Sequence, residues 1–451
     1  MERFGNIRFA RAMICGILRQ LEMQKIIFAI GLIVALSACA PTPTLIPPAT
    51  PTAISTPTAS PTIQPTNHPT IQPSPTPAQI TLRVWHALPY AHHPAFNALV
   101  KQFNAAHPDI QIAEAYQGDY ATLIKKARAD QPDAILAYSD DIAEFAQRGA
   151  VIALDDWLDT KEIFPAFVDR YPRADNKMYS VAFARSLQVM YYNADLLKVA
   201  GLTKPPTTWD EFAQVCAAIA KIPDTACYAL NPNATTFALW LYNRGGEFFS
   251  ADGKTISLNQ KPGLDTLTFL SELFKKKSAI LTTRAFQEPS DFAAGKIAFT
   301  FDTTNGLSAY DRAIKSASRQ IAWGIAPSPR TTREPVVIAS GASIAIFKTS
   351  PARERAAFIF AQWLIENAEW HRATGTFPAR ASARGALAEY IKSNPQYGAA
   401  FDLLRFARTE PNLAGWSAMR VPIADAMLAV AMGKAPGDAL SDAAKKIETA
   451  R

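Results

Sequence analysis

A proline- and threonine-rich tract over residues 41–77 constrains this chain more than any other feature, because it cannot form a packed core. It holds 12 Pro and 10 Thr in 37 residues, with no Asp, Glu, Lys or Arg. Such a segment buries too little apolar surface to offset the entropy lost on ordering. Polyproline II geometry, at about 3.1 Å per residue, predicts a spacer on the order of 100 Å long. The tract therefore separates a short leader from a body of about 370 residues, which is long enough for two lobes.

The leader has the organisation of an export signal. Basic residues precede the apolar run over residues 26–35. About ten apolar residues are too few to span a membrane but are typical of a signal-peptide core. The small residues Ser37 and Ala38 precede Cys39, and Leu36–Cys39 resembles the lipobox of bacterial lipoproteins. This resemblance implies cleavage before Cys39 and lipid attachment to it, which would anchor an extracytoplasmic protein to the outer face of the cell membrane. The alternative is an ordinary secretory signal with a chance cysteine.

Charge and cysteine content narrow the class of the body. The chain has a formal net charge of +7, of which the leader carries +3. The body has no basic run, so we do not expect a nucleic-acid partner. Cys216 and Cys227 lie 11 positions apart, the first in a predicted helix and the second in a predicted strand. An exported compartment permits disulfides, so we predict a bond between them; a metal pair is less favoured because no histidine lies nearby.

Strands and helices alternate at the start of the body. Ile80, Leu82 and Val84 alternate with polar residues, which predicts a strand over residues 80–84. A helix with apolar residues at positions i, i+3, i+4 and i+7 follows from Pro94, and further strands are predicted over 110–113 and 133–137. This order predicts an α/β fold with a largely parallel sheet covered on both faces.

Seven segments along the body resemble the extracellular solute-binding proteins of ABC importers, a group that includes receptors for maltose-type sugars and for glycerol phosphate. Phe183–Asn193, followed by residues 205–209, is the most specific of them. The others are residues 84–87 with 96–104, 118–120, 141–145 with 149–151, 244–246, 341–343 and 370–378. The resemblance implies a two-lobed periplasmic-binding-protein-like fold (type 2), in which each lobe is a mixed sheet flanked by helices. It also implies hinge closure on a solute, with no catalysis and no cofactor.

The resemblance also implies a division of the chain. Residues 1–38 would be the signal peptide, and residues 39–78 the lipid anchor and tether. The N-terminal lobe would comprise residues 79–186 plus 331–379, and the C-terminal lobe residues 187–330 plus 380–451, with a first crossover near residues 182–188. The expected partners are a small solute (a sugar or a phosphodiester), the ABC permease subunits and, through the anchor, the membrane. We expect a monomer.

Ligand contacts are carried over where the motifs match. The matching positions are Tyr120, Arg185, Ser186, Thr303, Thr304, Gly341 and Arg420. Arg420 lies where the glycerol-phosphate branch has an arginine that engages phosphate, a role that suits the planar guanidinium. A salt-bridge role remains open for Arg185. Ser139 stands where that branch has an acid and Thr376 where it has a tyrosine, and both departures argue against glycerol phosphate itself.

Aromatic residues bear on the sugar interpretation, because a sugar ring packs its apolar face on an aromatic plane. Trp85, Trp240 and Tyr242 are the candidates, and Trp240 is included in the predicted site. The alternative for each is a place in the core.

Two other functional classes have some support in the sequence. His86, His92 and His93 lie close together, as in some metal sites, but the chain has no His-Glu-x-x-His motif, so no metal is predicted. An exported hydrolase is the alternative of another class, although no Gly-x-Ser-x-Gly turn is present. The sequence therefore predicts a lipid-anchored receptor for a sugar or oligosaccharide. A receptor for glycerol phosphate or a glycerophosphodiester is the alternative within the same fold.

Overall fold

The computed structural model describes residues 79–171, 175–250, 253–282 and 287–450, so the predicted leader and the whole of the tether lie outside the described residues. Its strands are β1 Ile80–His86, β2 Ile110–Tyr116, β3 Ala134–Ala137, β4 Val168–Arg170, β5 Met178–Asn193, β6 Ala226–Leu230, β7 Ala279–Leu281, β8 Ile297–Thr303, β9 Trp323–Ala326, β10 Val337–Ile346 and β11 Ala407–Arg408.

The helices before residue 320 are α2 His93–Ala106, α3 Tyr120–Ala129, α4 Ser139–Gln147, α5 Ala194–Val199, α6 Trp209–Ile219, α7 Ala234–Tyr242, α8 Lys261–Lys275, α9 Gln287–Ala293 and α10 Leu307–Ser316. Those after it are α11 Pro351–Glu366, α12 Ala368–Thr374, α13 Ala388–Ser393, α14 Pro395–Leu403, α15 Trp416–Ala431 and α16 Pro436–Ala450. Short 3-10 turns are η1 Tyr90–His92, η2 Pro165–Phe167, η3 Thr304–Gly306, η4 Ala381–Arg384 and η5 Leu404–Phe406.

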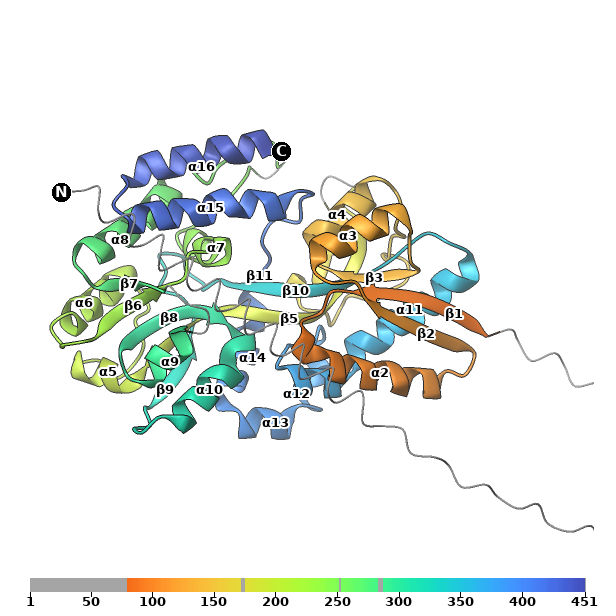
Figure 1. Ribbon diagram of the computed structural model, residues 1–451, viewed down its shortest axis with the longest axis horizontal. Helices are drawn as coiled ribbons and strands as arrows, with labels where there is room; N and C mark the ends of the chain where they lie inside the picture. Colours follow the sequence, from red (N-terminus) through yellow and green to blue (C-terminus); the bar gives the residue numbers. More distant parts are fainter. Residues whose placement is uncertain (1–78, 172–174, 251–252, 283–286, 451) are drawn as a thin grey trace, which may run out of the picture. The chain divides into compact units, whose positions relative to one another are not determined.

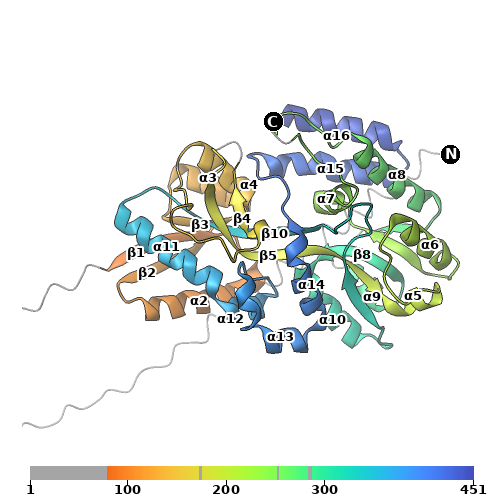
Figure 2. The same ribbon diagram turned by 180° about the vertical axis from the view of Figure 1, so that it is seen from behind.

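The first three strands form a parallel sheet, as the alternation of strands and helices predicted, but five of the ten strand pairings among the described residues are antiparallel, so the sheet as a whole is mixed rather than largely parallel. β1 pairs in parallel with both β2 and β3. Leu82 and Val84 are fully buried while Thr81 and Arg83, which alternate with them, are exposed, which is the predicted period of two. Helices α3 and α4 lie on one face of these strands, and α2 and α11 lie on the other (Figures 1 and 2). The sheet is thus covered on both faces.

Two long strands, β5 and β10, join the two halves of the body. The first half of β5 pairs with β4, its last residues pair with β8 and β9, and β10 runs antiparallel beside it (Figure 1). The described strands form one sheet in the order β2-β1-β3-β10-β5-β8-β6-β7, with β4 and β9 on β5 and β11 on β10. The strands that pair with β5 change near Gln188. β4 pairs with the start of β5, and β8 pairs with it from Gln188 onward, where Gln188 lies opposite Thr303. A single sheet therefore passes from one half of the body into the other.

The second half has its own core. Helices α6, α7, α8, α15 and α16 share one cluster of buried residues with β6 and β8. Thr208 and Glu211 form a reciprocal capping box at the start of α6, which satisfies backbone N–H groups that would otherwise lack partners. Cys216 of α6 is bonded to Cys227 of β6, and their Cα atoms are 4.9 Å apart. The predicted disulfide is confirmed. Within the described part of the chain, no helix combines the length and the apolar character that crossing a bilayer requires.

Candidate functional site

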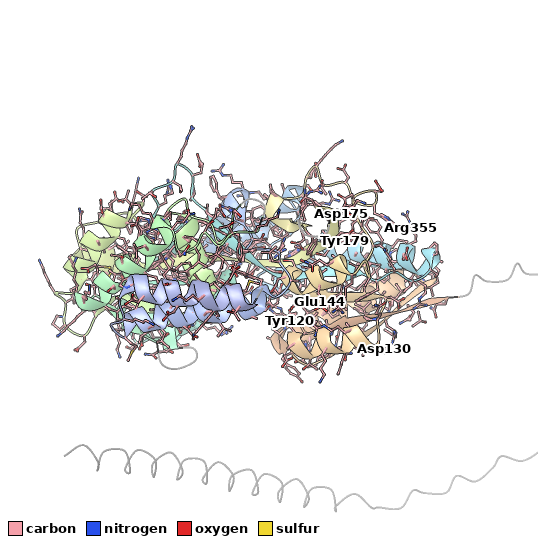
Figure 3. All side chains as sticks on the ribbon, turned by 90° about the horizontal axis from the view of Figure 1, so that it is seen from above. Tyr120, Asp130, Glu144, Asp175, Tyr179 and Arg355 are labelled. Atoms are coloured by element: carbon pink, nitrogen blue, oxygen red, sulfur yellow. A yellow bond between two sulfur atoms is a disulfide. The ribbon has the colours of Figure 1, made fainter. Side chains whose placement is uncertain are left out.

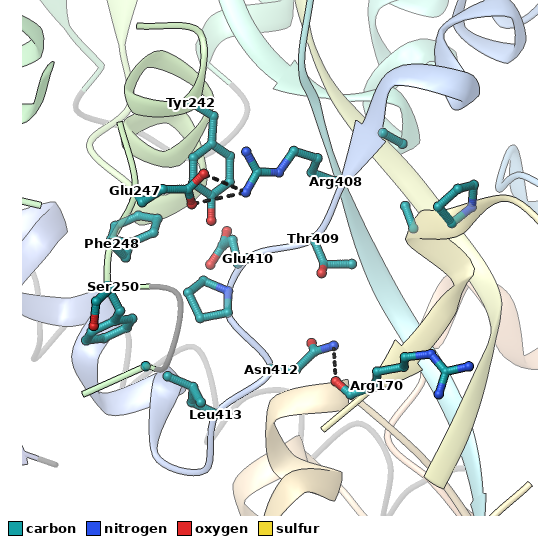
Figure 4. A pocket seen from close by; sticks show the side chains of 16 residues that line it. Arg170, Tyr242, Glu247, Phe248, Ser250, Arg408, Thr409, Glu410, Asn412 and Leu413 are labelled. Carbon is teal, nitrogen blue, oxygen red and sulfur yellow. Dashed lines mark hydrogen bonds and ion pairs between the residues drawn. The ribbon is translucent and has the colours of Figure 1, made fainter. Parts of the chain in front are cut away.

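Two adjoining cavities lie at the junction of the two halves. The inner cavity has a volume of about 240 Å³ and the outer one about 600 Å³. The loop over residues 409–412, between β11 and α15, lines both cavities (Figure 4). The inner cavity is lined by Tyr138, Ser139, Asp140, Arg185, Thr235, Ala339, Ser340, Gly341, Thr409, Glu410, Pro411, Asn412, Trp416, Ser417 and Arg420. Because these residues come from five stretches of sequence, the whole fold is needed to build the site.

The floor of the inner cavity is the pairing of β5 with β10. Gly341 lies opposite Arg185 in this register. Its φ of 148° is one that other residues rarely adopt, and a Cβ atom there would lie 1.8 Å from the carbonyl oxygen of Ala184. Glycine therefore allows the two strands to approach closely beneath the cavity.

Arg185 lines the cavity while its charge is neutralised from behind. A guanidinium N–H donates to Oδ1 of Asp169 at 2.5 Å. Asp169 is fully buried and also accepts from the hydroxyls of Ser180 at 3.0 Å and Ser343 at 2.5 Å. Three strands, β4, β5 and β10, thus meet at this carboxylate. Arg185 has the salt-bridge role that the sequence left open, and it also reaches the cavity wall.

Glu410 lines the inner cavity and is the centre of a hydrogen-bonded network. Its Oε1 accepts from the Thr235 hydroxyl at 2.6 Å, and its Oε2 accepts from the Trp416 indole N–H at 2.7 Å and from Arg420. Arg420 also donates to the Thr235 hydroxyl at 3.0 Å. Glu410 is 9 % exposed whereas the side chain of Arg420 is 37 % exposed, so the ion pair joins a buried carboxylate to a half-buried guanidinium inside a hydrogen-bonded network.

The start of α4 supplies the acidic part of the wall. The Ser139 hydroxyl donates to Oδ1 of Asn412 at 2.6 Å, and the Ser417 hydroxyl donates to Oδ2 of Asp140 at 2.6 Å. Burial raises the pKa of Asp140, although the hydrogen bond from Ser417 and the charge of Arg420 oppose the shift. Ser139 was expected to leave this position without an acid. Position 139 itself carries no acid, but Asp140, one residue further along, brings a carboxylate to the same cavity.

Aromatic and charged side chains surround the outer cavity (Figure 4). The guanidinium of Arg408 lies 4.1 Å from the ring centroid of Tyr242 and donates to both carboxylate oxygens of Glu247 at 3.0 Å. Phe248 adds a second aromatic side chain to the same wall. Across the cavity, Asn412 donates to the backbone carbonyl of Arg170 at 3.4 Å. The outer cavity thus combines aromatic surface with paired charges.

Six predicted residues lie in or beside the inner cavity. Ser139, Arg185, Gly341 and Arg420 line it. Ser186 donates its hydroxyl to the carbonyl of the lining residue Ser340 at 3.3 Å. Tyr120, at the start of α3 (Figure 3), packs its ring on that of the lining residue Tyr138, with centroids 4.4 Å apart.

Four predicted residues lie elsewhere. Trp240 is fully buried in the core of the second half, where its ring packs edge-on against Trp209, so it does not reach either cavity. The hydroxyl of Thr304 accepts from the backbone N–H of Leu187 at 3.0 Å, and Thr304 lines a separate cavity of about 420 Å³. The others form internal hydrogen bonds: the Thr303 carbonyl accepts from Tyr191, and the Thr376 hydroxyl is 3.1 Å from His371 Nδ1.

Sequence reasoning missed several lining residues. They are Asp140, Thr235, Glu410, Asn412 and Ser417. Asp140 had a usable signal, since it follows a buried strand at the start of a helix. The others lie in a loop or at a helix terminus and carry no motif. Of the aromatic candidates, Tyr242 lines the outer cavity.

The three histidines considered for metal binding lie apart from the cavities. His86 Nε2 is 2.9 Å from Glu114 Oε2, and His93 Nε2 is 3.0 Å from the carbonyl oxygen of Leu88. Burial lowers the pKa of both His86 and His92. In the described ranges, no three His, Cys, Asp or Glu side chains are grouped as metal ligands would be.

Two family models match this chain. The model described as bacterial extracellular solute-binding protein matches residues 91–369, which is more than half of the sequence. The model described as prokaryotic membrane lipoprotein lipid attachment site matches residues 23–40, a stretch that includes Cys39. The prediction of an extracytoplasmic, membrane-anchored lipoprotein is therefore confirmed.

Individual relatives resemble the chain at lower identity. The sn-glycerol-3-phosphate-binding periplasmic protein UgpB of Brucella abortus is 25 % identical over 253 residues, covering 51 % of this chain and 58 % of that protein. The chain thus matches little more than half the length of this curated relative.

Solved structures match over most of their length. The cyclic alpha-maltosyl-1,6-maltose binding protein of Arthrobacter globiformis has a TM-score of 0.72 at 21 % identity, over 83 % of this chain and 99 % of that one. UgpB of Mycobacterium tuberculosis, solved with glycerophosphocholine, has a TM-score of 0.68 at 22 % identity, over 82 % and 98 %. These likenesses confirm the predicted two-lobed α/β fold.

Proposed function

Because the chain belongs to the bacterial extracellular solute-binding proteins, we propose that it is the lipid-anchored receptor of an ABC importer and captures a neutral, carbohydrate-type solute. The solute occupies the two adjoining cavities and is handed to the permease subunits in the membrane. It is bound and released without bond chemistry, so the hydrolase alternative is set aside.

The charge balance of the inner cavity carries this proposal. Both of its arginines are already paired, Arg185 with Asp169 and Arg420 with Glu410. Asp140 adds a further carboxylate to the wall. An anionic solute would have to compete with these carboxylates for the guanidinium groups. A neutral polyol instead finds carboxylate and amide oxygens that accept hydrogen bonds from its hydroxyls.

The outer cavity supports a solute with a ring. Its volume of about 600 Å³ lies within the range of about 300–1,000 Å³ that is usual for small-molecule sites. Tyr242 and Phe248 provide aromatic surface for the apolar face of a sugar. The shared loop over residues 409–412 lets one ligand extend from the polar inner cavity into the aromatic outer cavity.

A phosphate-bearing solute is the second candidate. Two arginines line the inner cavity, and guanidinium groups are well suited to phosphate oxygens. The Brucella relative is described as binding sn-glycerol 3-phosphate. This candidate requires one arginine to exchange its carboxylate partner for the ligand.

The lobes in this proposal are those expected from the sequence, residues 79–186 plus 331–379 and residues 187–330 plus 380–451. They meet along β5 and β10, which pass between them side by side. A ligand that contacts both walls stabilises the closed arrangement, and the permease recognises that arrangement.

Identification of the co-purified ligand by mass spectrometry tests the proposal directly. Calorimetric titration of the detergent-solubilised protein then compares neutral oligosaccharides with sn-glycerol 3-phosphate and glycerophosphocholine. Arg420→Ala should cost about 2–5 kcal/mol in binding free energy if Arg420 pairs with an anionic ligand, and much less for a neutral sugar. Tyr242→Ala should weaken binding of a sugar. If phosphate esters bind and every neutral saccharide fails, the carbohydrate proposal is wrong.

A further inference from the structure

We propose that Glu410 is the residue that sets the charge selectivity of the cavity. In this role it occupies the guanidinium of Arg420 and so excludes anionic solutes. The inference rests on the proposed function, because it explains how an arginine-lined cavity comes to prefer neutral solutes. One side chain thus determines whether the cavity binds neutral or anionic solutes.

The contacts of Glu410 explain why its pairing with Arg420 persists. Thr235 and Trp416 donate to its two carboxylate oxygens at 2.6 and 2.7 Å, so the carboxylate is held in place by groups other than Arg420. The hydroxyl of Thr235 also accepts from Arg420 at 3.0 Å, so both charged groups are fixed to the same side chain. A phosphate approaching Arg420 would therefore face a fixed negative charge rather than a mobile one.

Because of its position, Glu410 can act against an anionic solute in either cavity. Glu410 lines both the inner and the outer cavity, so a solute that extends from one to the other passes beside it. The second lining arginine does not provide another anion site, because Asp169 and its serine partners hold Arg185 from behind. Freeing Arg420 thus exposes an unpaired guanidinium in the inner cavity without disturbing the buried pair of Arg185 with Asp169.

The test is the Glu410→Gln variant, which keeps the shape and one acceptor oxygen but removes the negative charge. In titrations with sn-glycerol 3-phosphate and with inorganic phosphate, the affinity of the variant should rise by about 10- to 100-fold over wild type, the usual worth of a hydrogen bond to a charged group. Binding of a neutral probe such as maltotriose should not rise. The double variant Glu410→Gln/Arg420→Met should lose the gain for phosphate.

Two matched variants separate this role from a simple change of net charge. Glu144→Gln removes a carboxylate of α4 (Figure 3) that pairs with Arg128 of α3 and with Arg148. Glu144 does not line the inner cavity, so phosphate binding should be unchanged. Asp140→Asn removes a charge within the lining but leaves the pairing of Arg420 intact, so its gain should be much smaller. An equal gain in Asp140→Asn would overturn the assignment to Glu410.

The outcomes distinguish this inference from the proposed function. A folded Glu410→Gln variant that binds phosphate no better than wild type overturns the inference, even if neutral saccharides bind. If wild type binds no saccharide but the variant gains phosphate, the proposed function fails and the role of Glu410 stands. Should Glu410→Gln not fold, Thr235→Val removes the hydroxyl that holds the pair together. A smaller gain in phosphate binding is then expected, and no gain overturns the inference.

Discussion

Removing the carboxylate of Asp169 should strongly destabilise the protein. Asp169 is fully buried, and Arg185, which it neutralises, is 2 % exposed. Asp169→Ala leaves a buried guanidinium without its partner, and deleting one member of such a pair costs about 3–5 kcal/mol. The hydroxyls of Ser180 and Ser343 also lose an acceptor. For a body of about 370 residues, the transition midpoint on heating should fall by roughly 5 °C.

Urea denaturation followed by circular dichroism measures the change in the free energy of unfolding. The double variant Asp169→Leu/Arg185→Met replaces both charges with apolar groups and should recover most of the loss, because buried ion pairs are often matched by packed apolar side chains. The surface pair of Arg83 with Asp130 (Figure 3), with side chains 45 % and 65 % exposed, is the control; Asp130→Ala should leave the midpoint nearly unchanged. A loss below about 1 kcal/mol for Asp169→Ala, or a double variant no more stable than the single one, would refute the reasoning.

Three further predictions concern stability and location. Replacing Cys216 and Cys227 with Ala should lower the free energy of unfolding by about 3 kcal/mol, the chain-entropy value for a loop of about a dozen residues; an unchanged urea midpoint contradicts it. Burial and Asp140 raise the pKa of Asp141 to about 7, so the folded state holds this proton more tightly than the unfolded chain. Stability should therefore fall as pH rises from about 4 to 7, and Asp141→Asn should remove that part of the fall; a wild-type-minus-variant difference that is flat with pH argues against it. Cys39→Ala should leave the protein unprocessed or released from membranes, and full detergent-phase partitioning of a cleaved variant would contradict the lipid anchor.

Local patterns predicted the fold well. The period of two in β1 depends only on neighbours in sequence, and it is present in the structure. The disulfide could also be predicted from the sequence, because a helix followed closely by a strand brings Cys216 and Cys227 together. These features need little knowledge of how distant segments pack.

The site was harder to predict, because its contacts join residues far apart in the chain. Thr235 and Glu410 are separated by 175 positions, and no local pattern announces their hydrogen bond. Trp240 was misplaced for a different reason. All nine residues of α7 are buried, and a helix that is apolar all round belongs to the core, so the sequence did contain a signal against its place in the cavity.

Two hydrogen bonds between residues that line the inner cavity set a minimum number of hydroxyl groups that a solute must bring. Ser139 donates to Asn412, and Ser417 donates to Asp140, so the walls satisfy one another before any solute enters. A solute that inserts between them must first replace what the walls lose, and only its additional hydrogen bonds add to affinity. A small alcohol would then replace only the hydrogen bonds that the walls lose, whereas a sugar with several hydroxyls forms additional hydrogen bonds and binds more tightly. Removing hydroxyls one at a time from a bound sugar should reduce affinity in steps until binding is lost. A smooth dependence of affinity on solute size alone would argue against a required minimum number of hydroxyls.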